Sequence, residues 1–101
     1  MDEQAIGERL VLETEQVRIW EDIVEPGTEQ AVHTHRNPYV SVMVTPARGQ
    51  IIGADGSVMY DVDRQPGESR WFGPERMPVT HTLRNTGDSV IRVVVIEVLA
   101  P

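Results

Sequence analysis

Short runs rich in Val, Ile and Thr alternate with turn-forming residues along the whole chain. The turn signals lie at Pro26-Gly27, Asn37-Pro38, Pro46 to Gly49, Asp55-Gly56, Pro66-Gly67, Gly73-Pro74 and Asn85 to Asp88. Short strands separated by turns at such regular intervals are typical of an all-β sandwich or barrel.

The runs between these turns predict the strands, and little helix is expected. Strands are predicted at Arg9–Thr14, Val17–Val24, Gln30–His35, Tyr39–Thr45, Gln50–Gly53, Ser57–Asp63, Ser69–Phe72, Val79–Arg84 and Val90–Leu99. Only Asp2–Leu10 could form a helical turn or two. "ADGS" at 54–57 predicts a two-residue hairpin, because Asp-Gly can supply the positive φ angles of a type I′ turn.

The last predicted strand, "VIRVVVIEVL", is apolar at nearly every position. That pattern suits a strand covered on both faces, as when two sheets close over one another or a subunit packs outside. It equally suits a central strand of one sheet.

Length and charge narrow the class of protein. A chain of 101 residues predicts one domain over 1–101, here a barrel core at about 17–98 preceded by an N-terminal arm at 1–9. A net charge of -7 without a basic cluster argues against nucleic acid or an anionic membrane as partner. The acidic start lacks a secretory signal and no run reaches the ~20 apolar residues of a membrane span, so we expect a cytoplasmic protein.

The three histidines carry the candidate chemistry. The chain has no cysteine, which excludes disulfides, thiolate nucleophiles and thiolate metal sites. His33 and His35 are separated by one residue, so both would lie on one face of a strand and could bind one metal ion. The same spacing also arises by coincidence.

Around these histidines the chain resembles the cupin superfamily of small β-barrels. Gly27, His33 and His35 match the first cupin motif, which runs Gly, five residues, His-x-His. Gly67, His81 and Asn85 match the ends of the second motif, and an "NTGD" turn follows. The resemblance covers roughly 17–98, and "VRIWEDIVEPG" with "HTHRNPYVSV" looks closest to the small cupins grouped with β-alanine degradation proteins.

The sequence departs from the cupin pattern in two places. Where the first motif expects Glu, the chain has Tyr39 and Val40, neither of which is a carboxylate ligand. Fourteen positions separate Gly67 from His81 (81 − 67), more than usual, so we expect an extended loop before His81.

The resemblance implies an all-β fold, the cupin β-barrel or double-stranded β-helix of jelly-roll type. It also implies a metal site made by His33, His35 and His81, although a vestigial site without metal is the alternative. Imidazole suits Fe, Zn, Ni and Cu, and we expect Fe(II) ahead of Zn, Ni or Mn.

Some cupins with three-histidine iron sites are dioxygenases, so the resemblance implies a non-haem Fe(II) dioxygenase acting on a small acidic or dicarbonyl substrate. The alternatives are a non-catalytic ligand- or metal-binding module, such as a sensor or accessory protein, and a Zn- or Ni-dependent isomerase or lyase. The partners expected are a small-molecule substrate or ligand and, by resemblance, a second copy in a homodimer.

Two further side chains are candidates for the catalytic site. Tyr39 would share the face of His35 if the strand ran unbroken through Asn37-Pro38, and its phenol could donate to a substrate oxyanion. Arg70 could clamp a carboxylate. Each also has a structural interpretation, as a packed aromatic and a solvated edge residue. We expect packing roles for Tyr60, Trp71 and Phe72, and core or pocket-filling roles for Met43, Met59 and Met77. Asn85 is expected to hold the turn after the His81 strand, since Asn tolerates the left-handed conformation.

Overall fold

The computed structural model describes residues 5–99, and almost all of its regular structure is β-strand. The strands are β1 (Arg9–Glu13), β2 (Val17–Val24), β3 (His33–His35), β4 (Tyr39–Met43), β5 (Ala47–Gly53), β6 (Val58–Arg64), β7 (Ser69–Phe72), β8 (Val79–Asn85) and β9 (Ile91–Val98). One 3₁₀ helix, η1 (Pro74–Arg76), precedes β8. No helix among the described residues is long and apolar enough to cross a membrane.

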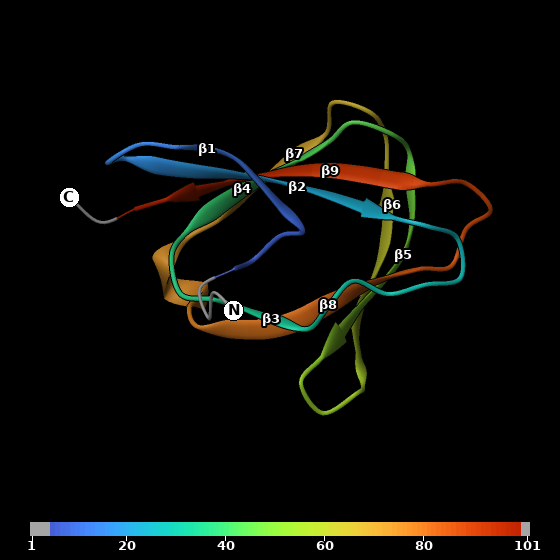
Figure 1. The fold of residues 1–101 in the computed structure, drawn as a ribbon. Helices are drawn as coiled ribbons and strands as arrows, with labels where there is room; N and C mark the ends of the chain where they lie inside the picture. Colours follow the sequence, from blue (N-terminus) through green and yellow to red (C-terminus); the bar gives the residue numbers. More distant parts are fainter. Residues whose placement is uncertain (1–4, 100–101) are drawn as a thin grey trace.

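Two antiparallel sheets face one another (Figure 1). The first has the strand order β1-β2-β9-β4-β7 and the second the order β3-β8-β5-β6. The β6–β7 connection joins an edge strand of each sheet, and no ladder pairs these two strands. The predicted all-β fold is therefore confirmed, and the molecule has one side where the two sheets are joined only by a turn.

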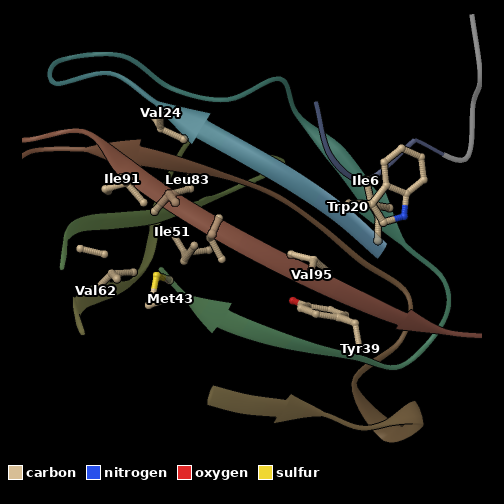
Figure 2. Close-up of a cluster of buried hydrophobic side chains, with 12 residues drawn as sticks. Ile6, Trp20, Val24, Tyr39, Met43, Ile51, Val62, Leu83, Ile91 and Val95 are labelled. Atoms are coloured by element: carbon tan, nitrogen blue, oxygen red, sulfur yellow. The ribbon is translucent and has the colours of Figure 1, made fainter. Parts of the chain in front are cut away.

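The inner faces of the two sheets form the core. In β9, Ile91, Val93 and Val95 are buried and alternate with residues that are exposed or half-buried. Figure 2 shows Val24, Ile51, Val62 and Leu83 gathered with them between the sheets. β9 lies between β2 and β4, so its apolar run is that of a central strand, and its outer face is only partly covered.

The N-terminal segment covers one end of this core. Residues 5–8 run from the side of β3 toward β1 (Figure 1), and Ile6 is only 2% exposed. The helical turn predicted for Asp2–Leu10 is wrong for the described part, because Arg9 and Leu10 belong to β1 and residues 5–8 are not helical. Positions 2–4 of that prediction lie outside the described residues.

Most strand predictions hold, and the errors fall at strand ends. Val17–Val24 and Ser69–Phe72 are confirmed to the residue. The turn predicted at Pro46 to Gly49 is wrong, because β5 begins at Ala47 and pairs with β6 from there. β3 is shorter than predicted, since only His33–His35 forms a ladder with β8, and Glu29 makes just an isolated bridge to Arg84.

The β5–β6 hairpin is confirmed, but its predicted turn type is wrong. A type I′ turn needs positive φ at two central residues, whereas here only Gly56 has one (φ 85°) and Asp55 does not. The Gly56 N–H donates to the Gly53 carbonyl, and the Asp55 carboxylate accepts from the N–H and hydroxyl of Ser57. The aspartate thus stabilises the turn by accepting hydrogen bonds from Ser57.

Asn85 also holds a turn in a way the sequence did not predict. No residue other than glycine has positive φ among the described residues, so the left-handed conformation expected for Asn85 is wrong. Its side chain, 1% exposed, donates to the Val24 and Ser89 carbonyls and accepts from the Gly87 N–H. These bonds tie the β8–β9 turn to the end of β2.

Candidate metal centre

Three imidazoles meet on the inner face of the second sheet. His33 in β3 lies directly opposite His81 in β8, and alternation along β3 puts His35 on the same face as His33. The potential ligand atoms of the three side chains lie within 4.8 Å of one another. The ring centroids are 4.7–4.9 Å apart with interplanar angles of 76–83°, so the rings meet edge to face.

The spacing of the His33 and His35 nitrogens fits two ligands of one metal ion. Nε2 of His33 and Nε2 of His35 are 3.0 Å apart. With metal–nitrogen bonds of about 2.0–2.1 Å, two ligands at right angles lie about 3 Å apart. The group contains no carboxylate, so its ligand set is neutral. This agrees with the sequence, which lacks the Glu that the first cupin motif expects.

The histidines are held in the protonation state that binds metals. Nδ1 of His33 lies 2.9 Å from the Ala31 carbonyl, which can only accept, so Nδ1 carries the proton and Nε2 the lone pair. Burial lowers the pKa of all three rings, to about 2 for His35 and about 4 for His81, with the neighbouring His33 adding to the effect. Neutral imidazole at pH 7 is the ligating form.

Tyr39 stacks on His35, although the two lie in different sheets. The chain turns at Asn37-Pro38 from the second sheet into β4 of the first, so the unbroken strand considered from the sequence does not form. The rings meet instead across the interior, with centroids 3.9 Å apart and an interplanar angle of 18°. Asn37 secures this turn by donating to the buried carboxylate of Glu97 (2.8 Å).

The phenol of Tyr39 belongs to a longer stack. Its other face packs on Phe72 at 4.6 Å, and the Arg76 guanidinium lies 5.5 Å from the Phe72 ring centre. Burial raises the pKa of Tyr39 above its usual range, so the hydroxyl stays a proton donor at neutral pH. Figure 2 shows this hydroxyl pointing into the interior beside Val95.

A small cavity connects the histidines with the inner faces of both sheets. It encloses about 60 Å³ and is lined by His33, His35, His81 and Tyr39 among others. This is more than the minimum volume that one water molecule requires, and room for no more than a few. Without rearrangement, only a small ligand fits beside the histidines.

Arg64 lines the same cavity, and sequence reasoning missed it. The guanidinium donates to the Ser41 hydroxyl at 2.8 Å and to the Ser41 and Glu68 carbonyls, so it ties β6 to the opposite sheet. The residue is only 4% exposed. Its spacing from Val62 and Tyr60 places it on the inner face of β6, a signal that the acidic surroundings in "DVDR" obscured.

Asp22 is a second buried group that the sequence did not single out. It lies on the inner face of β2 between Trp20 and Val24, lines the cavity and is 4% exposed. Burial raises its pKa to about 6, although the N–H of Glu8 (2.7 Å) and the side chain of Gln30 donate to it. A carboxylate between two apolar inward residues is the sequence signal that could have found it.

The other predicted residues divide between the cavity and the surface. Arg70 is exposed on β7 but reaches the cavity lining, and Tyr60 is half-buried against the core as predicted. Packing is confirmed for Met43, Met77 and Phe72. It is wrong for Trp71, which is 56% exposed on the edge strand β7. Met59 is 48% exposed but lines a pocket together with Tyr39 and His81, so its pocket-filling role is confirmed.

Comparison with known proteins identifies the architecture. No family model matches the chain, and no curated protein matches it in sequence. Its structure is similar to a cupin domain from Bordetella pertussis Tohama I, with a TM-score of 0.78, 26% identity and coverage of 91% of each chain.

Two more distant structures share the arrangement. One is an uncharacterized conserved protein with a double-stranded β-helix domain from Klebsiella pneumoniae (TM-score 0.66, 20% identity, 88% of this chain and 72% of that one). The other is the polyketide cyclase RemF from Streptomyces resistomycificus (TM-score 0.61, 15% identity, 84% of this chain and 56% of that one). At these identities the likeness concerns the fold alone.

Proposed function

Because the protein has the cupin fold, a double-stranded β-helix, around a three-histidine cluster, we propose that it is a metal-dependent enzyme for a small substrate. The observation that supports this most directly is the convergence of three neutral imidazoles on one cavity. His33, His35 and His81 would hold a divalent ion, which would leave coordination positions for a substrate.

In its most specific form, the proposal is that the protein is a non-haem Fe(II) dioxygenase acting on a small acidic or dicarbonyl compound. Iron held by three imidazoles would supply oxygen activation, and the neutral ligand set favours a substrate that brings its own negative charge. Tyr39 would donate from its phenol to an oxygen of the bound substrate, and its stacking on His35 would keep that ligand in place.

A second candidate is a Zn- or Ni-dependent isomerase or lyase. The observation that favours it is the absence of a carboxylate from the histidine group. An ion held by neutral ligands alone is a stronger Lewis acid toward a carbonyl oxygen. RemF, which shares the fold, is described as a polyketide cyclase, so an enzyme other than an oxygenase is found on this fold.

Metal content tests the proposal and separates its two forms. We expect protein purified without a histidine tag to hold close to one equivalent of metal by elemental analysis, and His81→Ala to lose most of it. Arg84→Ala, on the same strand with its side chain paired to Glu29, is the control that should keep the metal.

The identity of the metal then directs the activity assay. Iron predicts oxygen consumption with a small dicarbonyl such as pentane-2,4-dione, measured with an oxygen electrode, and none with His81→Ala. Zinc or nickel without oxygen uptake would favour the isomerase or lyase. Wild-type protein that holds no metal even after reconstitution would refute both.

A further inference from the structure

Arg64 is a buried cation whose nearest partners are almost all neutral. Its terminal nitrogens donate to the Ser41 hydroxyl and to the carbonyls of Ser41 and Glu68. Its Nε has no hydrogen-bond partner. The Glu68 carboxylate lies 3.8 Å from Nε, beyond hydrogen-bond distance, and the Glu68 side chain is 46% exposed.

Such a charge is costly to bury unless an anion accompanies it. Burial lowers the pKa of Arg64, with the charge of Arg70 adding to the effect, yet an arginine stays protonated at neutral pH. The three hydrogen bonds to neutral oxygens satisfy donors but do not neutralise the charge. Arg64 therefore lines the cavity with a charge that only the half-exposed carboxylate of Glu68, 3.8 Å from Nε, partly offsets.

Arg70 brings a second cation to the same wall. It lines the histidine cavity on one side and, on the other, an outer groove of about 420 Å³ between β6 and β7. Arg70 takes part in no ion pair among residues 5–99. The guanidinium groups of Arg64 and Arg70, with only the half-exposed carboxylate of Glu68 beside them, make this region positively charged, although the chain has a net charge of -7.

The hydroxyl of Tyr60 completes this wall. Tyr60 lines both the cavity and the outer groove, and burial raises its pKa, so the phenol remains a donor. The groove also holds Arg76 and one carboxylate, Asp61. Donors and positive charge therefore collect beside β6 and β7, at one pair of sheet edges.

We propose that Arg64, Arg70 and Tyr60 form an anion-binding subsite that admits a small carboxylate to the histidine cavity between β6 and β7. This inference rests on the proposed function. It means that the substrate of the metal site is a small organic acid rather than a neutral carbonyl compound. The carboxylate would pair with the guanidinium groups of Arg64 and Arg70, and would offset the buried charge. A cavity of about 60 Å³ suits a ligand as small as acetate.

The test is binding of acetate and of its neutral isostere acetamide to metal-free protein, followed by NMR of the arginine Nε–H and tryptophan signals. Metal is removed so that acetate cannot bind through it. The variant is Arg70→Gln, because Arg70 is exposed and its loss should leave the fold intact. Arg48→Gln is the matched control, with the same charge change at an exposed position outside the cavity.

We expect saturable shifts with acetate and none with acetamide. Arg70→Gln should weaken acetate binding by about tenfold, the usual effect of losing a charge-assisted hydrogen bond, and Arg48→Gln by less than about twofold. Equal binding of acetamide, or equal weakening in the two variants, would overturn the proposal.

Metal content of the same variants separates this inference from the proposed function. Arg70→Gln should take up metal as the wild type does, because Arg70 is not one of the three histidine ligands. Normal metal uptake with acetate binding unaffected by Arg70→Gln would refute the anion subsite and leave the metal enzyme standing. Acetate binding that depends on Arg70 in a protein unable to hold metal would refute the metal enzyme alone.

Discussion

At the scale of single residues, Asp22 should make stability fall as the pH rises. Burial raises its pKa from 3.8 to about 6, so the folded protein binds this proton more tightly than the unfolded chain does. Stability contributed by the protonated form is complete below pH 3.8 and is lost as the pH passes 6. A shift of this size corresponds to an upper limit of about 3 kcal/mol.

Asp22→Asn removes that titration while keeping an oxygen to accept from Glu8. At pH 7 we expect its free energy of unfolding to exceed that of the wild type by about 1–3 kcal/mol, with the difference vanishing below about pH 4. Urea unfolding of metal-free protein at both pH values measures it, and the exposed Asp63→Asn should change stability by less than about 0.5 kcal/mol. Lower stability of Asp22→Asn at pH 7 would mean that the hydrogen bonds to the carboxylate outweigh its burial.

The sequence predicted the histidines and Arg70 but not the two buried charged groups beside them. His33, His35 and His81 stand out because the chain has no other histidine and their spacing matches a motif. Arg64 and Asp22 are ordinary members of a chain with sixteen acidic and nine basic residues. Their burial depends on which strand face turns inward, and alternation predicts that only once the strand boundaries are known.

At the scale of elements, substitutions of Asn85 can show whether this residue holds the β8–β9 turn by its backbone conformation or by its side-chain hydrogen bonds. Because its φ is not positive, Asn85→Gly should not preserve stability. We expect Asn85→Ala and Asn85→Gly each to lower the free energy of unfolding by about 2–4 kcal/mol, since three hydrogen bonds in a buried site are lost.

Thermal or urea unfolding measures the effect of the Asn85 substitutions. The exposed neighbour Thr86→Ala is the control and should stay within about 0.5 kcal/mol of the wild type. If the glycine variant were as stable as the wild type and the alanine variant were destabilised, the position would instead require a left-handed backbone conformation.

Elements were predicted better than their ends. The β-branched runs predicted where strands lie, because pairing on a half-buried sheet favours such residues. Their ends depend on long-range pairing: Pro46 and Gly49 favour a turn locally, yet pairing with β6 makes the chain from Ala47 onward strand. η1 was not predicted, because a single turn after Gly73-Pro74 has no periodic pattern to reveal it.

At the scale of the whole molecule, the homodimer implied by family resemblance remains a prediction, and we expect β1 to carry it. β1 is an edge strand, and Leu10, Val11 and Leu12 are 42%, 51% and 49% exposed. An apolar edge strand is a template for pairing with another chain.

Light scattering after size-exclusion chromatography tests this arrangement. We expect about twice the 11.3 kDa chain mass for the wild type and the monomer mass for Leu12→Lys. Val58→Lys, at a comparably exposed position (47%) on β6, should remain dimeric. A monomeric wild type, or a Leu12→Lys variant that still dimerises, would exclude β1 as the interface.

The opposite positions of the two tryptophans give the protein two separate optical reporters. Trp20 is 4% exposed and donates to the buried carboxylate of Glu97, so its emission reports on the integrity of the core. Trp71 is 56% exposed and lines the outer groove beside Arg70, so its emission responds to solvent and to quenchers there. Intrinsic fluorescence can therefore follow unfolding and occupation of the groove in one sample, without an added dye.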